Sequence, residues 1–263
     1  VNVKLAYDFI KPGVDPLSLE NPIVLGAGPL VGTLAPGSSR IYATTKLPIN
    51  GAVGWAGAGG MSFGCMLKNA GYDHVIIKGC ADRPVFLKIF DEEVGICDAQ
   101  NLWGESVGET SKRLWIEFGR PLGTIAIGQA GENLVKFSMA FVDGTSTLGR
   151  GGFGAVMGSK NLKAIVVRGT KGVGVFDPKR FMELVDRVYE RIKRWQRLRE
   201  WHEFGFWVGI PLLPKEMFYE LFESRLSCIS CPIGDKDVVR IKRGECKGMA
   251  KRVTSALNAV MPM

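Results

Sequence analysis

The sequence has few of the features that mark membrane, secreted or disordered proteins. No uninterrupted apolar run approaches the roughly 20 residues of a transmembrane helix, and the N-terminus lacks the basic-then-apolar order of a secretory signal. Only two of the six cysteines, Cys228 and Cys231, lie close together, which argues against a disulfide scaffold. Apolar residues make up 46% of the chain, enough to bury a core. We therefore expect a cytoplasmic protein without a membrane span.

Acidic residues are outnumbered by basic ones. The chain has 34 Lys and Arg against 26 Asp and Glu, a formal net charge of +8. Such an excess suits an anionic ligand, an acidic protein partner or nucleic acid, and a solvated basic surface is the alternative. Aromatic residues lie beside basic ones between Trp195 and Trp207, but Trp195 falls on the apolar side of a predicted helix. We therefore do not expect a nucleic-acid-binding module.

Short β-branched runs, separated by Gly, Pro and Asp, predict strands in the first two thirds of the chain. Ser106 and Glu109 form a capping box, and Gly119 ends the apolar pattern that follows, so a helix is predicted among the strands. The predicted strands are residues 22–26, 41–45, 74–78, 85–90, 124–127 and 164–167, with a hairpin turn at residues 91–93.

Two segments of the sequence resemble each other. Residues 57–79 and 149–169 share one order of Gly, Met and Lys before a β-branched run that ends in glycine. The strands ending at Gly26 and Gly128 correspond in the same way. The repeat predicts two similar β-rich half-domains with one ligand between their glycine loops. Chance similarity of glycine-rich segments is the alternative.

Beyond Gly174 the pattern becomes helical. Asp177 is a typical N-cap and Pro178 a typical first helical residue. Apolar residues recur at helical spacing from Phe181 to Trp195, and acidic side chains share the polar face with Arg and Lys. This pattern indicates a helix that packs against its own protein.

These patterns together predict an α+β fold. Residues 1–172 are expected to form a β-rich domain of two pseudo-twofold-related halves, and residues 173–263 the start of a helical domain that carries the Cys228–Cys231 loop. This second domain is too short and too rich in proline to form a full core, and the sequence opens at Val1 rather than Met. We therefore expect a part of a longer protein.

The glycine loops are candidate anion sites. Paired glycines let the backbone approach a ligand and turn its N–H groups toward it. Arg150 stands in the second loop, and Arg40 comes just before the strand that precedes the first. Two guanidinium groups beside exposed amides suit phosphate. Neither loop fits a Walker motif or the dinucleotide fingerprint, and turn glycines without a ligand are the alternative.

The Cys228–Cys231 pair fits a redox dithiol, half a zinc site or part of an iron–sulfur site. No βαβ pattern supports the thioredoxin type, and a zinc site lacks ligands because only Cys246 lies nearby. Asp235 could ligate iron, although a carboxylate matches iron less well than a thiolate. From spacing alone, a cluster, a zinc site and structural cysteines all stay open.

Residues 12–169 resemble the N-terminal domain of the tungsten-containing aldehyde:ferredoxin oxidoreductase family. The segments that carry the resemblance are Pro12–Pro22 (PGVDPLSLENP), Gly28–Thr33 (GPLVGT), Thr45–Pro48 (TKLP), Ala70–Asp73 (AGYD), Ala130–Asn133 (AGEN) and Gly149–Ile165 (GRGGFGAVMGSKNLKAI). In that family the first domain is β-rich, has two pseudo-twofold halves and forms the base on which two pterin dithiolenes bind. The resemblance implies a bis-pterin cofactor with tungsten, or with molybdenum, and Mg bridging the pterin phosphates.

The resemblance also implies which residues contact the pterins. They are Arg40, Gly57 and Gly59 for one pterin, and Ser146, Thr147, Gly149 and Arg150 for the other. The family commonly has Asn at the position of Gly57 and Arg-Ala at the positions of Ser146 and Thr147, so this chain departs from the pattern there.

A 4Fe–4S cluster is implied at Cys228, Cys231 and Asp235. The family motif is CxxCxxxC, and Asp235 stands at its third cysteine. Ligation by Cys246 instead, or loss of the cluster, are the alternatives. The family's fourth cluster cysteine and its acid–base groups belong to later domains, so no catalytic residue is assigned in this chain.

The reaction implied is the oxidation of an aldehyde and water to a carboxylic acid in an anaerobic organism. Electrons would pass to ferredoxin or to an iron–sulfur subunit, and we expect an oligomeric enzyme. A relative in the family instead reduces the aromatic ring of benzoyl-coenzyme A, and the unusual Asp235 keeps that reaction open. A truncated, non-catalytic chain that binds pterin or scaffolds electron-transfer partners is the third alternative.

Overall fold

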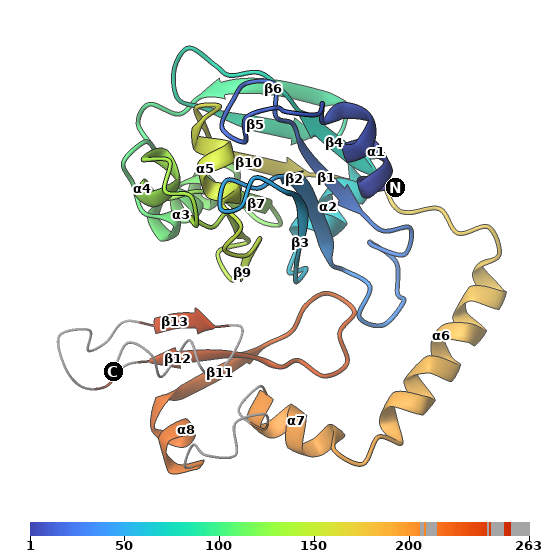
Figure 1. The fold of residues 1–263 in the computed structure, drawn as a ribbon. Helices are drawn as coiled ribbons and strands as arrows, with labels where there is room; N and C mark the ends of the chain where they lie inside the picture. Colours follow the sequence, from blue (N-terminus) through green and yellow to red (C-terminus); the bar gives the residue numbers. More distant parts are fainter. Residues whose placement is uncertain (206–207, 209–214, 241, 243–249, 254–263) are drawn as a thin grey trace. The chain divides into compact units, whose positions relative to one another are not determined.

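The chain divides into two compact units. In this computed structural model, residues 1–205, 208, 215–240, 242 and 250–253 are described. The first unit contains Val1–Thr33 and Ser38–Gly174, and the second contains Leu34–Gly37 and the chain from Val175 onward (Figure 1). The boundary predicted after residue 172 lies two residues before this division. Among the described residues, none of the helices combines the length and the apolar character that crossing a bilayer requires.

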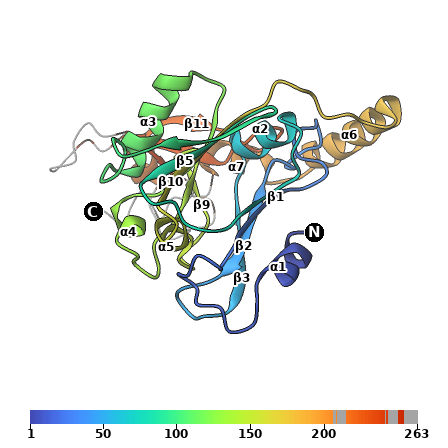
Figure 2. The same cartoon turned by 90° about the horizontal axis from the view of Figure 1, so that it is seen from above.

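The first half of the β-rich unit is a four-stranded antiparallel sheet in the order β3-β2-β1-β4. Its central strand β1 is buried at all five residues, because it is covered on both faces. Figure 2 shows β1, β2 and β3 side by side. The elements are α1 (Asn2–Phe9), β1 (Ile23–Ala27), β2 (Ile41–Lys46), β3 (Val53–Ala58), α2 (Phe63–Asn69) and β4 (His74–Ile77).

The second half repeats this strand order as β9-β8-β7-β10, and its six-stranded sheet continues through β5 to β6. Strand β10 pairs antiparallel with β7 and parallel with β5. The elements are β5 (Val85–Phe90), β6 (Glu93–Asp98), α3 (Val107–Phe118), β7 (Gly123–Ala126), α4 (Gln129–Glu132), β8 (Phe141–Val142), β9 (Ser146–Thr147), α5 (Phe153–Gly158) and β10 (Leu162–Arg168). The two halves predicted from the repeat are therefore confirmed: in each, a short helix links the third strand to the last.

Most of the predicted local structure is confirmed. All six predicted strands are present, and Asp91 turns the β5–β6 hairpin with a left-handed φ of 51°. The Ser106 side chain accepts a hydrogen bond from Glu109 N at 3.2 Å, and Gly119 ends α3 with φ of 72°. Helices α1, α2, α4 and α5 and strands β3, β8 and β9 were not predicted, because each has at most eight residues and so too few to show a clear periodicity.

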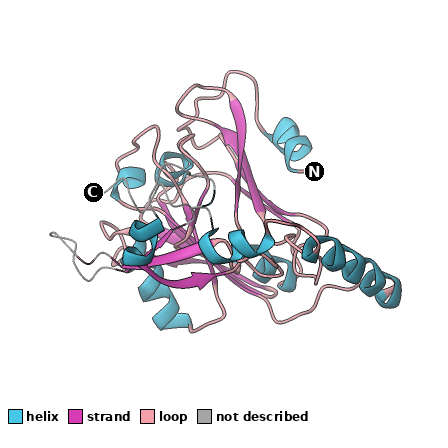
Figure 3. Cartoon of the chain, turned by 90° about the horizontal axis from the view of Figure 1, so that it is seen from below, coloured by secondary structure: helices cyan, strands magenta, loops and turns pink. Residues whose placement is uncertain are grey.

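The second unit starts with helices and continues into a three-stranded antiparallel sheet that the sequence did not predict (Figure 3). Asp177 caps α6 by accepting from Arg180 N at 2.9 Å, as predicted. Trp195, however, lies beyond the last helical residue, Lys193, so its assignment to the helix was wrong. The elements are α6 (Pro178–Lys193), α7 (Leu198–Phe204), α8 (Lys215–Leu221), β11 (Phe222–Leu226), β12 (Lys236–Arg240) and β13 (Ala250–Val253).

The two halves of the first unit share one hydrophobic core. Helix α2 of the first half contributes Phe63 and Leu67, both fully buried, and packs against β7 and β10 of the second half. Ile125 of β7 and Ile165 of β10 belong to the same cluster. The approach is close, since a Cβ atom placed on Gly123 would lie 2.4 Å from Cα of Phe63.

A buried carboxylate joins the halves at the start of α2. Asp143, 3% exposed, lies in the second half. Its Oδ2 accepts from the backbone N of Ser62 at 2.7 Å and of Phe63 at 2.9 Å, while Oδ1 accepts from Thr124 N at 2.9 Å. Burial raises the pKa of this carboxyl, and the three N–H donors oppose the rise. Asp143 thus satisfies the free N–H groups at the start of α2, where Ser62 provides no side-chain cap.

Replacing this carboxylate is expected to loosen the two halves. In Asp143→Asn one amide oxygen replaces two carboxylate oxygens, so at least one buried N–H loses its acceptor, at a cost of about 2 kcal/mol. Chemical denaturation of both proteins measures the difference. Asp82→Asn, the same change at an exposed position, is the control and should stay within about 0.5 kcal/mol of the parent. Equal stability of the two variants would contradict this role of Asp143.

Candidate cofactor site

The first glycine loop follows β3 and is held against the residues before β2. The exposed Arg40 donates from Nη1 to Gly57 O at 3.2 Å. Ser39 Oγ donates to Gly60 O at 3.0 Å, and a Cβ on Gly60 would lie 1.6 Å from Ser39 O. Only glycine fits at position 60, because the two backbones touch. The guanidinium of Arg40 and the backbone of residues 57–60, which include Gly59, are therefore held together.

The second glycine loop follows β9 and opens α5. Gly149 has φ of 70° and Gly152 has φ of 97°, both in the left-handed region that favours glycine. A Cβ on Gly152 would lie 2.4 Å from Lys136 O and 2.9 Å from the ring of Pro48, which belongs to the first half. This loop is therefore seated on the first half of the unit as well as on its own.

The structure brings the two predicted pterin-binding segments together. Strand β3 of the first half contacts β9 of the second (Figure 1), and a Cβ on Gly149 would lie 3.8 Å from the Cβ of Ala56. Ser146 and Thr147 form β9, pairing with Val142 and Phe141. The third strands of the two halves, one of which carries Gly57 while the other precedes Gly149, thus meet.

The side chains at this junction fit an anionic ligand. Arg150 is exposed and forms neither a hydrogen bond nor an ion pair with any residue that the structure describes. The buried hydroxyl of Ser146 also lacks a partner among the described residues. A guanidinium presents five N–H donors, and Arg40 uses one of these on Gly57. Arg40 and Arg150 can each bind phosphate oxygens with charge-assisted hydrogen bonds.

This chain has Gly57 at a position where the resemblance implies Asn, and neighbouring side chains fill the space beside that glycine. A Cβ there would lie 2.9 Å from the Tyr42 ring and 3.2 Å from Cδ of Arg40. The Tyr42 ring packs in turn against Trp55, with centroids 5.8 Å apart. Tyr42 therefore occupies the space that a larger side chain at position 57 would need.

A buried ion pair that the sequence did not predict supports the second glycine loop through α4 and α5. Lys163 and Glu132, with side chains 0% and 5% exposed, form a salt bridge. Lys163 Nζ also donates to Glu105 O at 2.8 Å, and Glu132 Oε2 accepts from Gly104 N at 3.0 Å. Because both charges are paired and hydrogen-bonded, their burial is tolerated. The pair fixes α4, whose Gly131 lies against α5, and so supports the helix that the loop opens.

The Cys228–Cys231 loop connects β11 to β12 in the second unit. Cys231 N donates to Cys228 O at 3.0 Å, which closes a turn with Ser230 at φ of 58°. Lys236 Nζ donates to Cys228 Sγ at 3.0 Å. Two cysteines on one turn and an N–H donor to a sulfur are both typical of iron–sulfur sites.

The third predicted ligand is not brought to this pair. Among the described residues, no three His, Cys, Asp or Glu side chains lie close enough to hold a metal ion together. Asp235 is half-buried, and Cys246 falls outside the described residues. The ligand set Cys228, Cys231 and Asp235 therefore stays a prediction.

Beside the loop lies a second buried acid that the sequence analysis missed. Asp237, 3% exposed, has its Oδ1 3.0 Å from Nη1 of Arg225. Burial raises the pKa of Asp237 to about 6, against the effect of Arg225, and Asp235 adds to the rise. No sequence signal marked Asp237, because it lies in β12, a strand that was not predicted.

Comparison with known proteins identifies relatives along most of the first unit. The tungsten-containing aldehyde ferredoxin oxidoreductase of Pyrococcus abyssi is 50% identical over 184 residues, which are 70% of this chain and 30% of that protein. The protein of that name in Pyrococcus furiosus is 48% identical over 192 residues, 73% of this chain and 32% of that protein. This chain thus spans about a third of the length of these curated relatives.

A solved structure extends the similarity into the second unit. The active-site complex BamBC of benzoyl coenzyme A reductase, solved with 1,5-dienoyl-CoA, matches with a TM-score of 0.82 and 30% identity, covering 95% of this chain and 43% of that chain. The sequence model of the aldehyde ferredoxin oxidoreductase N-terminal domain matches residues 1–169. Because that match covers well over half of the 263 residues, the chain belongs to the aldehyde ferredoxin oxidoreductase family.

Proposed function

We propose that this chain is the N-terminal part of a tungsten bis-pterin, iron–sulfur oxidoreductase that oxidises aldehydes to carboxylic acids and passes electrons to ferredoxin. The observation that carries the proposal is the junction of β3 and β9, where Arg40, Arg150 and two glycine loops lie on adjoining segments. The names of the relatives at 48–50% identity support the metal, the substrate class and the acceptor.

The residues of this chain bind and orient the cofactor. Arg40, with the backbone at Gly57 and Gly59, holds one pterin, and Arg150, with Gly149, Ser146 and Thr147, holds the other. The guanidinium groups would balance phosphate charge without losing their own protons, and a bound Mg would share that charge. The bound cofactor supplies the redox chemistry.

Electron transfer is assigned to the second unit. Cys228 and Cys231 would each ligate an iron of a 4Fe–4S cluster, and Lys236 donates a hydrogen bond to the Cys228 sulfur. Asp235, at the third position of the motif, would have to move toward the pair to ligate the cluster, because the described residues contain no group of three possible ligands. Hydrogen bonds to cluster sulfurs and the exposure of the cluster tune its reduction potential. Ferredoxin, or an iron–sulfur subunit, accepts the electrons one at a time.

A second candidate function is favoured by the similarity to the benzoyl coenzyme A reductase complex, which covers 95% of this chain. In this case the protein would reduce an aromatic acyl-CoA at low potential. The higher sequence identity to the aldehyde oxidoreductases makes aldehyde oxidation the first choice. A chain that binds pterin without catalysis is the remaining alternative.

Elemental analysis and two assays separate these functions. The protein is purified anaerobically from cells supplied with tungstate, and tungsten, molybdenum and iron are measured per chain. Aldehyde-dependent reduction of ferredoxin together with bound tungsten supports the first function, and benzoyl-CoA reduction supports the second. Tungsten without either activity indicates a binding protein, while zinc alone would overturn the cluster assignment.

The arginine at the second loop provides a sharp test of cofactor binding. We expect Arg150→Ala to reduce the tungsten retained per chain about tenfold, because about 1.4 kcal/mol of charge-assisted binding is lost. Thermal stability should not change, since Arg150 is exposed and forms no hydrogen bond or ion pair with a described residue. Arg83→Ala is the matched control, because Arg83 is also exposed and forms only a surface ion pair with Asp98 at 3.3 Å. Unchanged tungsten content in Arg150→Ala would contradict its assigned role.

The cluster ligands are tested by iron content and by the electron paramagnetic resonance spectrum of the reduced protein. Cys228→Ser should lower iron to background and remove the cluster signal, because a thiolate ligand is lost. Asp235→Ala should also lower iron, whereas Cys80→Ser, at an exposed cysteine of the first unit, should not. Full iron content in Asp235→Ala would exclude Asp235 and point to Cys246.

A further inference from the structure

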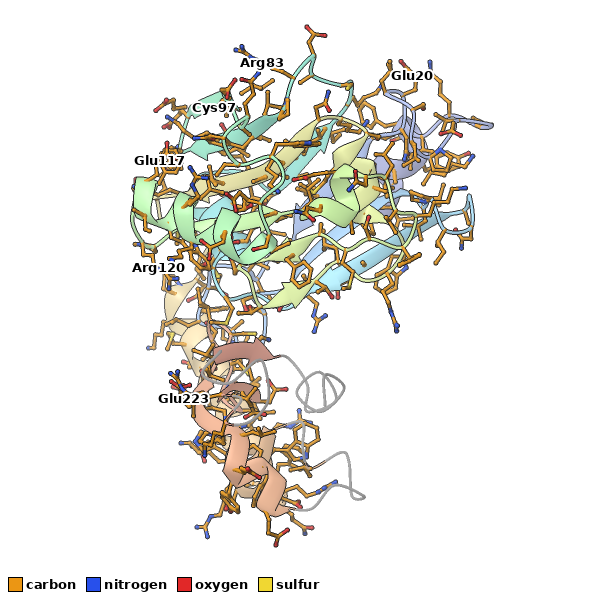
Figure 4. All side chains as sticks on the ribbon, turned by 90° about the vertical axis from the view of Figure 1, so that its left-hand side faces the viewer. Glu20, Arg83, Cys97, Glu117, Arg120 and Glu223 are labelled. Carbon is orange, nitrogen blue, oxygen red and sulfur yellow. The ribbon has the colours of Figure 1, made fainter. Side chains whose placement is uncertain are left out.

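A pocket of about 210 Å³ lies in the first unit and is not lined by residues of either glycine loop. Residues 77–81, which end β4 and follow it, form one wall, and β5, β6 and β10 supply the others. Its apolar lining includes Ile77, Val85, Leu87 and Ile96. Figure 4 shows Cys97, the neighbour of Ile96 on β6, and Arg83, just before β5. The pocket thus lies between β4, an edge strand of the first sheet, and strands β6, β5 and β10 of the second.

Besides the exposed Lys78, the pocket is lined by the buried Lys160. The residue is 3% exposed, and Nζ donates to Leu19 O at 3.3 Å and to Gly79 O at 3.2 Å. No carboxylate of the described residues lies within 4 Å of it, whereas the equally buried Lys163 is paired with Glu132. An ammonium has three N–H donors, so Lys160 keeps one donor and an unbalanced positive charge.

Several nearby groups act on this ammonium. Burial lowers the pKa of Lys160 to about 8; Cys80 and Glu20 raise it, and the exposed Lys78 lowers it. Lys160 is therefore mostly charged at neutral pH. A buried charge without a counter-ion is unfavourable, and a bound anion in the pocket would offset that cost.

We propose that this pocket binds a small amphipathic carboxylate, whose carboxyl group accepts a hydrogen bond from Lys160 while its hydrocarbon part lies against Ile77, Val85, Leu87 and Ile96. The chemistry favours a monocarboxylate over phosphate, because a dianion with three oxygens needs more donors than one buried ammonium and the exposed Lys78 provide. The volume is below the roughly 300 Å³ of pockets for drug-sized ligands, so it suits an acid with a short chain or one ring. This site is independent of the proposed oxidoreductase function.

Titration with sodium hexanoate tests the proposal. Methyl resonances of isoleucine, leucine and valine are followed by NMR, and 1-hexanol serves as an uncharged probe of the same chain length. We expect saturable shifts at Ile77, Val85, Leu87 and Ile96, and about tenfold weaker binding of hexanol, because the charge-assisted hydrogen bond is lost. Hexanoate binding should also weaken as the pH rises from about 7 to about 9.5, when Lys160 loses its proton.

A variant at the mouth of the pocket keeps the test independent of folding. Ile96 is 75% exposed, so Ile96→Glu should fold normally and place a negative charge beside the ligand. We expect hexanoate affinity to fall about fivefold through like-charge repulsion. Ile116→Glu, at an equally exposed isoleucine on α3, is the control and should bind as the parent does.

Three outcomes would overturn the proposal. They are equal affinities for hexanoate and hexanol, equal hexanoate affinities for Ile96→Glu and Ile116→Glu, and shifts confined to residues outside the pocket. Loss of tungsten or of redox activity in a separate experiment leaves these outcomes unaffected, so failure of this site and failure of the proposed function are distinguishable.

Discussion

The first unit depends on the carboxylate of Asp143. It comes from the second half of the repeat and satisfies the N–H groups at the start of α2 in the first half. It also binds Thr124 N of its own half, so a single side chain holds both. A buried carboxylate is stable only with such partners. With α2 fixed on the second sheet, the glycine loop that precedes it keeps its place beside β9.

In the proposed site, the closely packed backbone and the charged side chains have different roles. Glycines are needed where backbones touch, as Gly60 does at Ser39 and Gly152 does at Lys136. The loops are therefore rigid through close packing, and their amides need not be ordered when a ligand binds. Arg150, by contrast, is exposed, forms no hydrogen bond or ion pair with a described residue, and is available to an anion. Packing sets the shape of the site, and two guanidinium groups provide its charge.

The sequence predicted much of the fold because its signals were local. Strand composition, the cap at Ser106 and the cap at Asp177 depend on neighbours within a few residues. The repeat was also visible, since glycine positions are set by backbone contact. Three contacts were not predictable, because each joins residues distant in sequence or hidden among similar charges. They are the contact between β3 and β9, the pair of Lys163 with Glu132, and the pair of Asp237 with Arg225. The three-stranded sheet of the second unit was missed because its strands are short and interrupted by the cysteine loop.

The matching strand order of the two halves has a consequence for how such a unit could have arisen. A single half would expose the surface on which α2 packs against the other sheet, and would leave the N–H groups of α2 without the carboxylate that binds them. It would have to pair with a second copy, and the fraction of paired halves would depend on the protein concentration. Joining two copies in one polypeptide makes that pairing intramolecular. Each copy is then free to diverge, which accounts for an arginine placed before the second strand in one half and after the third strand in the other.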